Sequence, residues 1–135
     1  MEKLLCPSMM CADFGALKRE MEALEKAGID LYHLDVMDGK FVPNFGMGLQ
    51  DIQYICGQGK KPADVHLMIE DPGNYVELFA GLGAKIIYIH PEADTIRPEP
   101  CKGLSMRGLS LASRSIREPL SVLWRSFCIC PNTCW

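Results

Sequence analysis

The sequence predicts an α/β protein built on a parallel β-sheet. Apolar segments of strand length alternate with segments of helical periodicity from residue 4 to residue 90, and this alternation is typical of βαβ units. Polar residues gather where the predicted strands end, which is the functional edge of parallel sheets. The 135 residues are 48% hydrophobic and 23% charged, as in an ordinary globular domain.

The first strand is expected over residues 4–10, a short apolar run, and the first helix over residues 12–28. Apolar residues repeat at helical spacing through that helix. Asp13 is expected to be its N-cap and Gly28 its C-cap, because both residue types favour those positions.

The second strand is expected over residues 29–37. Its alternation places His33, Asp35 and Met37 on one face and apolar residues on the other. An Asp-Gly pair follows and ends the strand, so the histidine and the carboxylate lie toward its carboxyl end.

The remaining elements keep the same rhythm. Asp64, His66 and Met68 again share one face of a strand, and His90 ends the last one. Two helices and two strands are expected here, the helices over residues 47–59 and 72–83 and the strands over residues 63–69 and 84–90.

The rhythm stops after residue 95. Residues 1–95 carry 15 acidic and 8 basic side chains, whereas residues 96–135 carry 2 acidic and 6 basic ones, so the net charge changes from -7 to +4. Cysteine and serine also become more frequent. The tail contains Cys128, Cys130 and Cys134, but this spacing is a weak zinc signature.

The bulk properties exclude several classes of protein. No apolar run approaches the length of a membrane span, and the N-terminus lacks the features of a signal peptide. We therefore expect a cytoplasmic protein without a membrane partner. The net charge of -3 gives no reason to expect a nucleic-acid partner.

The chemistry of the strand ends suggests a metal site. His33, Asp35 and His66 offer two imidazoles and a carboxylate on adjacent strands, a donor set that suits a divalent ion. Such an ion polarises a carbonyl group, and a nearby carboxylate can then remove a proton from the adjacent carbon. Each histidine alone is explained more simply by packing, but the joint pattern favours the metal site. Met37 and Met68 fit either core packing or an apolar floor under a substrate.

Four segments together resemble the ribulose-phosphate 3-epimerase family. In chain order they are "CPSMMCADF", "HLDVMDGKFVPN", "DVHLMIEDPGNYVELFAGLGA" and "IIYIHPEAD". The resemblance implies a (β/α)8 TIM barrel, of which residues 1–95 would be the N-terminal half with the first four strands. Residues 96–135 would then be an aberrant tail.

The resemblance also implies roles for individual residues. His33, Asp35 and His66 match three of four ligands of one divalent ion (zinc, iron, manganese or cobalt). Asp35 also matches one of two acid/base carboxylates. Ser8 and His66 match residues that contact substrate, and Met37 and Met68 match methionines that line the pocket.

The activity implied is epimerisation at C3 of a ketose phosphate, D-ribulose 5-phosphate to D-xylulose 5-phosphate in the pentose phosphate pathway. Cys11 stands where many pentulose enzymes have serine, which leaves allulose-6-phosphate 3-epimerase as an alternative. Related barrel decarboxylases and aldolase-type synthases carry a lysine after the aspartate that Asp35 matches, and Val36 and Met37 stand there instead. A full-length family member is expected to be a homo-oligomer.

The family's second aspartate and its glycine-rich phosphate loop do not occur in the sequence. We therefore expect the 135-residue chain to be inactive, and a non-catalytic metal-binding or assembly fragment is the alternative from another class. If one base is restored in the codons for Thr95 to Pro98, and synonymous codons are chosen freely, residues 95–119 can be read as "THPARTLQRIVDAGAKPGIAINPGT". This translated sequence resembles the next βα unit of the family, so we predict that the tail is out of frame.

Overall fold

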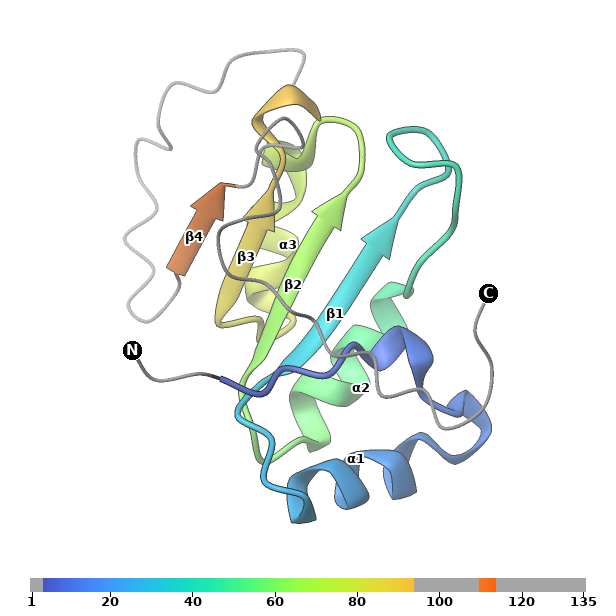
Figure 1. Ribbon diagram of the computed structural model, residues 1–135. Coiled ribbons are helices and arrows are strands. Elements are labelled where there is room, and N and C mark those ends of the chain that lie inside the picture. The colour runs from blue at the N-terminus through green and yellow to red at the C-terminus, as the bar shows by residue number, and fades with distance from the viewer. Residues whose placement is uncertain (1–3, 94–109, 114–135) are drawn as a thin grey trace.

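The computed structural model describes residues 4–93 and, as backbone only, residues 110–113. Its strands form one parallel sheet in the order β1-β2-β3-β4, with all arrows pointing the same way (Figure 1). The strands are β1 (Tyr32–Met37), β2 (Ala63–Met68), β3 (Ile86–Ile89) and β4 (Ser110–Ser113). The predicted α/β class with a parallel sheet is confirmed.

Three α-helices alternate with these strands. They are α1 (Leu17–Lys26), α2 (Leu49–Gln58) and α3 (Val76–Gly81), and four short 3-10 turns accompany them: η1 (Met9–Cys11), η2 (Phe14–Ala16), η3 (Pro72–Tyr75) and η4 (Pro91–Ala93). Each helix lies inside its expected range. Asp13 caps η2 rather than α1, because its Oδ1 accepts a hydrogen bond from the Gly15 N–H at 2.9 Å. Gly28 ends the α1 region with a φ of 85°, which a glycine adopts readily.

One face of the sheet forms the hydrophobic core. The side chains of Leu34, Val65, Leu67 and Ile87 are completely buried there. They belong to the same apolar cluster as residues from all three helices: Met21, Ile52, Ile55, Val76 and Phe79. Burying this surface is the main favourable term for the fold, and it leaves the alternate residues of each strand on the opposite face.

The expected strand over residues 4–10 is wrong. The backbone does lie beside β1, because the Leu5 carbonyl accepts from the Asp30 N–H at 2.9 Å and the Pro7 carbonyl accepts from the His33 N–H at 3.0 Å. Only Ser8 forms a β-bridge, with His33. Pro7 has no N–H to donate, and the chain turns into η1 directly after Ser8, so a continuous ladder cannot form.

The fourth strand instead comes from the tail, where none was expected. β4 pairs with β3 in parallel, from Ile86 opposite Ser110 to Ile89 opposite Ser113. The edge of β3 offers unpaired backbone groups, and any extended segment can satisfy them. Apart from β4, residues 96–135 lie outside the part of the chain that the structure describes, and the out-of-frame tail stays a prediction. Among the described helices, none has the length and apolarity needed to cross a membrane.

Candidate metal and proton-transfer site

The site is built by residues that alternate with the core positions of β1 and β2. The parallel register places His33 opposite Asp64 and Asp35 opposite His66. Side chains at positions two apart share a face, so all four lie on the face of the sheet opposite the core residues. The period of two in the sequence therefore predicted their common face correctly.

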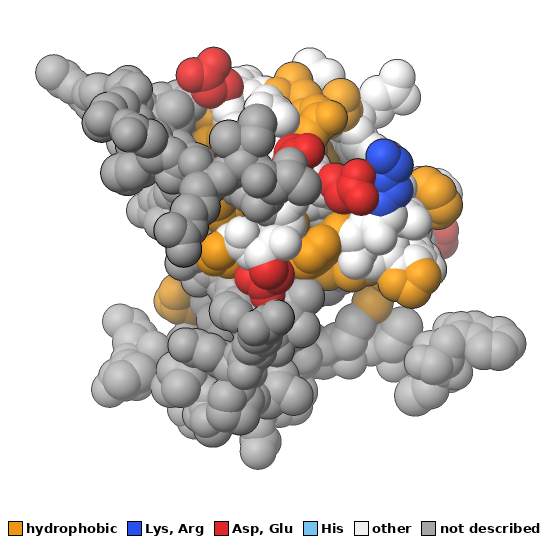
Figure 2. All heavy atoms as spheres, turned by 90° about the horizontal axis from the view of Figure 1, so that it is seen from above, with side chains coloured by type: hydrophobic (Ala, Val, Ile, Leu, Met, Phe, Trp, Pro, Cys, Tyr) orange, Lys and Arg blue, Asp and Glu red, His pale blue; other side chains and the backbone are white. Residues whose placement is uncertain are grey.

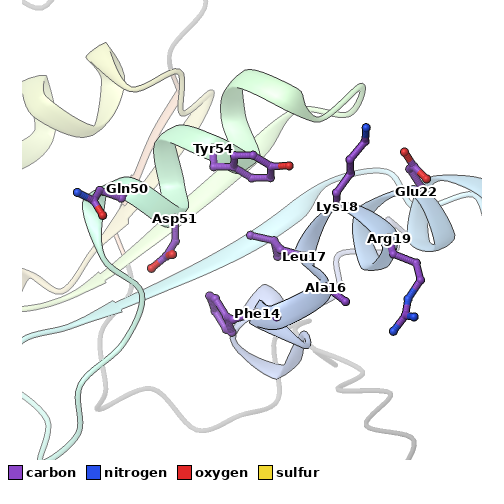
Figure 3. A pocket seen from close by; sticks show the side chains of 10 residues that line it. Phe14, Ala16, Leu17, Lys18, Arg19, Glu22, Gln50, Asp51 and Tyr54 are labelled. Carbon is purple, nitrogen blue, oxygen red and sulfur yellow. The ribbon is translucent and has the colours of Figure 1, made fainter.

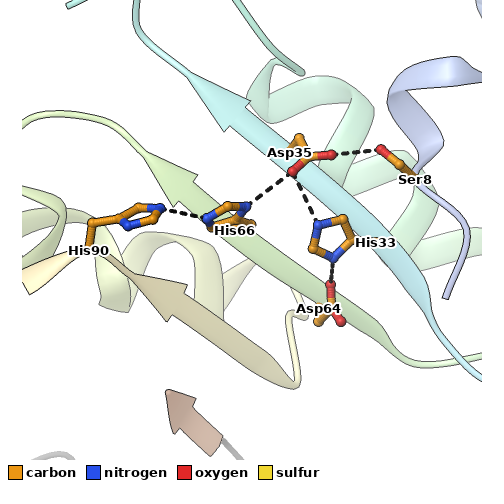
Figure 4. Close-up of polar contacts among 6 residues, drawn as sticks. All are labelled: Ser8, His33, Asp35, Asp64, His66 and His90. Atoms are coloured by element: carbon orange, nitrogen blue, oxygen red, sulfur yellow. Dashed lines mark hydrogen bonds and ion pairs between the residues drawn. The ribbon is translucent and has the colours of Figure 1, made fainter. Parts of the chain in front are cut away.

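Asp35 lies at the centre of this group (Figure 4). Its Oδ1 is 3.2 Å from His33 Nε2 and 3.3 Å from His66 Nδ1. One candidate ligand atom from each of the three residues falls within 4.8 Å of the others. The side chains of His33, Asp35 and His66 are 11%, 15% and 9% exposed, so the group is largely shielded from bulk water.

This donor set fits a divalent ion. Two imidazole nitrogens and one carboxylate oxygen suit zinc, iron, manganese or cobalt, and three protein ligands leave positions open for other ligands. The structure thus brings together the three residues that the sequence nominated as ligands. The identity of the ion, and the binding itself, stay predictions.

The electrostatics favour ionised groups in the metal-free protein. Burial alone would lower the pKa of His33, but its hydrogen bonds to Asp35 and Asp64 raise that pKa to about 9. Burial alone would raise the pKa of Asp35, but hydrogen bonds from His33, His66 and Ser8 hold it far below its usual range. Asp35 is therefore a carboxylate at any physiological pH.

Ser8 gives the two oxygens of Asp35 different surroundings. Its hydroxyl donates to Asp35 Oδ2 at 2.7 Å, whereas Oδ1 faces the two histidines. Ser8 reaches this position because its backbone bridges to His33 just before η1 turns away. One oxygen of Asp35 is thus directed to the metal-binding group, and the other to the hydroxyl.

Met37 and Met68 are directly opposite each other at the ends of β1 and β2. Both are half-buried, and neither belongs to the buried apolar cluster between sheet and helices. They lie on the same face as Asp35 and His66, one residue pair further along the strands. This position is compatible with the expected apolar floor under a substrate, which stays a prediction.

Two further polar residues contact the histidines, and the sequence gave them no role. Asp64 is completely buried and accepts a hydrogen bond from His33 Nδ1 at 2.5 Å. His90, 4% exposed, places its Nε2 2.8 Å from His66 Nε2. The period of two put Asp64 on this face and His90 at a strand end, but spacing does not show which ring nitrogen meets which neighbour.

A family model described as "Ribulose-phosphate 3 epimerase family" matches residues 4–108. The chain belongs to the ribulose-phosphate 3-epimerase family. The match extends past residue 95, where the resemblance was expected to end. The family is one of (β/α)8 barrels, and the described sheet corresponds to part of such a barrel.

Curated relatives align with a similar part of this epimerase-family chain. Ribulose-phosphate 3-epimerase from Bacillus subtilis (strain 168) is 46% identical over 89 residues, which cover 66% of this chain and 41% of the relative. The Synechocystis enzyme is 48% identical over 89 residues, covering 66% and 39%. The Aquifex aeolicus enzyme is 40% identical over 90 residues, covering 67% and 40%. The chain spans about two fifths of the length of these relatives.

The loops after β1 and β2 are linked to each other at the carboxyl end of the epimerase-family sheet. Asp38 accepts hydrogen bonds from the backbone N–H groups of Lys40, Phe41 and Glu70 at 2.9, 3.0 and 2.8 Å. Lys40 and Glu70 also form an exposed ion pair at 3.1 Å. From this end, acidic and basic side chains lie side by side among hydrophobic ones on the described surface (Figure 2).

A cavity among the described residues lies elsewhere. It has a volume of about 760 Å³ and is bounded by η2, α1 and α2 (Figure 3). Phe14, Leu17 and Tyr54 line it, together with charged residues such as Arg19. None of His33, Asp35, Asp64 and His66, which together form the histidine–aspartate group, lines this cavity.

Proposed function

We propose that this site, when completed in the frame-restored protein, catalyses 3-epimerisation of a ketose phosphate, with D-ribulose 5-phosphate and D-xylulose 5-phosphate as substrate and product. The observation that carries the proposal is the division of Asp35, whose Oδ1 faces two imidazoles while Oδ2 accepts from Ser8. A metal ligand and a proton acceptor are thereby combined in one carboxylate. Family membership supports the choice of substrate class.

Each residue has a defined task in this proposal. His33, His66 and Asp35 Oδ1 would hold the ion, which when bound would stabilise negative charge on the substrate's carbonyl and hydroxyl oxygens. Asp35 Oδ2 removes the C3 proton, since the carboxylate is ionised. The Ser8 hydroxyl orients that oxygen through its 2.7 Å hydrogen bond. Met37 and Met68 exclude water from the substrate's apolar edge.

Inversion at C3 also needs an acid on the opposite face of the substrate. Among the described residues, the carboxylates in contact with the histidine–aspartate group are Asp35 itself and Asp64, and Asp64 binds the far nitrogen of His33. A single base returns a proton to the face from which it came. We therefore propose that the 135-residue chain does not invert C3 and that the frame-restored protein does.

The test is proton NMR of D-ribulose 5-phosphate in D2O with cobalt- or zinc-loaded protein. We expect the frame-restored protein to form D-xylulose 5-phosphate with deuterium at C3. We expect its Asp35→Asn variant to lose both exchange and conversion, while Glu70→Gln, a carboxylate-to-amide change at the rim, retains both. Conversion by the 135-residue chain, or full activity of the Asp35→Asn variant, would contradict the proposal.

Two alternatives, a hexulose-phosphate epimerase and a non-catalytic metal-binding fragment, can be tested by the choice of substrate and by the presence of exchange at C3. D-allulose 6-phosphate is assayed in parallel, and a faster reaction with it would favour the hexulose enzyme. Cys11, which motivates that alternative, donates its backbone N–H to the Ser8 carbonyl at 3.3 Å and so shapes the turn that carries Ser8. Metal binding without exchange at C3 in either protein would favour the non-catalytic metal-binding fragment.

A further inference from the structure

We infer that Asp64 and His90 are positioning residues, which fix the tautomers of the two histidines so that His33 Nε2 and His66 Nδ1 present lone pairs beside Asp35 Oδ1. This inference rests on the metal site of the proposed function. It gives a role to two buried polar residues that contact the histidines but are not themselves candidate metal ligands.

Asp64 determines which nitrogen of His33 carries the hydrogen. In a neutral imidazole one nitrogen donates and the other accepts. Asp35 Oδ1, 3.2 Å from Nε2, would by itself favour a hydrogen on Nε2 and so block metal binding there. Asp64 Oδ1 lies closer to Nδ1, at 2.5 Å, and is completely buried, so its hydrogen bond is the stronger competitor. The hydrogen is thereby held on Nδ1, and Nε2 keeps its lone pair.

His90 performs the same task for His66. The two Nε2 atoms are 2.8 Å apart, so one must donate and the other accept. In the metal-free protein His66 Nδ1 donates to Asp35 Oδ1 at 3.3 Å. For Nδ1 to bind an ion, the hydrogen must lie on Nε2 instead, where His90 Nε2 can accept it. His90 then carries its own hydrogen on Nδ1, on the side of Glu92, whose Oε1 is 4.0 Å away. Figure 4 shows this line of contacts from Asp35 through His66 to His90.

Ring packing restricts rotation of the His66 and His90 imidazoles. Phe41 lies against His90 with ring centroids 5.1 Å apart, and Tyr88 meets His66 edge-on at 6.5 Å. These contacts hinder a ring flip that would exchange the two nitrogens of either histidine. The orientations of the His66 and His90 rings are therefore supported by aromatic neighbours as well as by hydrogen bonds.

Stability alone does not account for Asp64. Its Oδ2 is buried and has no hydrogen-bond partner among the described residues, and an unsatisfied buried carboxylate oxygen is unfavourable. Asp64 also lies outside the set of atoms that converge within 4.8 Å. Its contact with His33 instead has the form of the carboxylate–histidine pairs that orient metal ligands.

The first measurement is the tautomer of His33 in the unsubstituted, metal-free 135-residue chain. Nitrogen-15 NMR at a pH well above 9, where the ring is neutral, should show the hydrogen on Nδ1. In Asp64→Asn the population should shift toward a hydrogen on Nε2. A hydrogen on His33 Nε2 in the unsubstituted chain would overturn the inference, whether or not the variant folds.

The second measurement is a cobalt(II) titration followed by visible absorption. Asp64→Asn and His90→Gln should each weaken binding by about 10–100-fold, the usual effect of losing an outer hydrogen bond, and should shift the absorption bands. Glu70→Gln, which changes a rim carboxylate outside the group, should leave both affinity and spectrum unchanged.

The outcomes distinguish the two proposals. Absence of cobalt binding by the unsubstituted chain would contradict the metal site of the proposed function. Binding by the unsubstituted chain with equal affinity and an identical spectrum in both variants would overturn only the positioning role. Circular dichroism of each metal-free variant shows whether a change in affinity accompanies a change in fold.

Discussion

The two faces of β1 and β2 both bury most of their side chains, but one face does so with apolar contacts and the other with hydrogen bonds and ion pairs. On one face, Leu34, Val65, Leu67 and Ile87 are completely buried within the apolar cluster that the helices complete. On the other, His33, Asp35, Asp64 and His66 are linked by hydrogen bonds and ion pairs. The same strands therefore carry stability and chemistry on alternate residues.

This difference has an energetic meaning. Apolar burial stabilises the fold by roughly 25 cal/mol per Å². A buried network of charged groups contributes little net stability, because desolvation offsets the attraction between its members. Substitutions on the apolar face should therefore change folding, and substitutions on the polar face should change metal binding. Each prediction below tests this separation.

The largest effect is expected on the apolar face. Leu67→Ala should reduce the free energy of unfolding by about 2–5 kcal/mol, because it leaves a cavity at a completely buried position. Urea denaturation of the metal-free protein measures this loss. Metal affinity of the folded fraction should not change, and a loss below about 1 kcal/mol would show that this face is not the core.

A large loss of metal affinity is expected at the centre of the polar face. Asp35→Asn should weaken cobalt or zinc binding by more than the roughly 100-fold seen for outer-shell groups, or about 3 kcal/mol. Isothermal titration calorimetry measures the affinity. Asp35→Asn leaves the buried His33 without one of its charged partners, so it should also lower the free energy of unfolding. Unlike Leu67→Ala, it should weaken metal binding by the folded fraction, and an unchanged affinity would contradict the separation of the two faces.

The pH dependence of folding stability and of metal affinity should reflect the same hydrogen-bond network. The pKa of His33 is raised from 6.5 to about 9 in the folded, metal-free protein. Its protonation therefore stabilises the fold fully below about pH 6.5, and this contribution is lost as the pH rises through about 9. Metal affinity should increase across that window, because the proton competes with the ion for Nε2. NMR titration of the His33 ring gives its pKa, and a value near 6.5 would contradict the network.

The smallest effect is expected at the rim. Lys40→Gln removes an exposed ion pair with Glu70, and such pairs contribute about 0–1 kcal/mol. Neither the melting temperature nor metal affinity should change appreciably. A large loss of affinity would mean that the loop after β1 takes part in binding.

The sequence predicted the polar face well because strand alternation is local. The period of two placed His33, Asp35 and His66 correctly, and the adjacent strands brought them together. It failed for residues 4–10, where apolar character suggested a strand but Pro7 lacks the N–H that a ladder needs. It also gave no sign of β4, because pairing to the open edge of β3 depends on backbone groups rather than on side chains.

The roles of Asp64 and His90 were inaccessible for a different reason. Sequence spacing gives the face of a strand, but not the reach of a side chain or the nitrogen it meets. The distances of 2.5 Å from Asp64 Oδ1 to His33 Nδ1 and of 2.8 Å between the Nε2 atoms of His66 and His90 come only from the structure. They show that both residues contact the ring nitrogens that do not face Asp35.

X-ray absorption spectroscopy of the zinc-loaded 135-residue chain tests the central claim most directly. The chain contains seven cysteines as well as three histidines, and zinc bonds to sulfur are longer than those to nitrogen or oxygen, about 2.3 Å against about 2.0–2.2 Å. The account predicts a shell of nitrogen and oxygen alone, with the scattering of two imidazoles. A sulfur shell, or a spectrum unchanged in Asp35→Asn, would contradict the assignment of His33, Asp35 and His66 as the metal ligands.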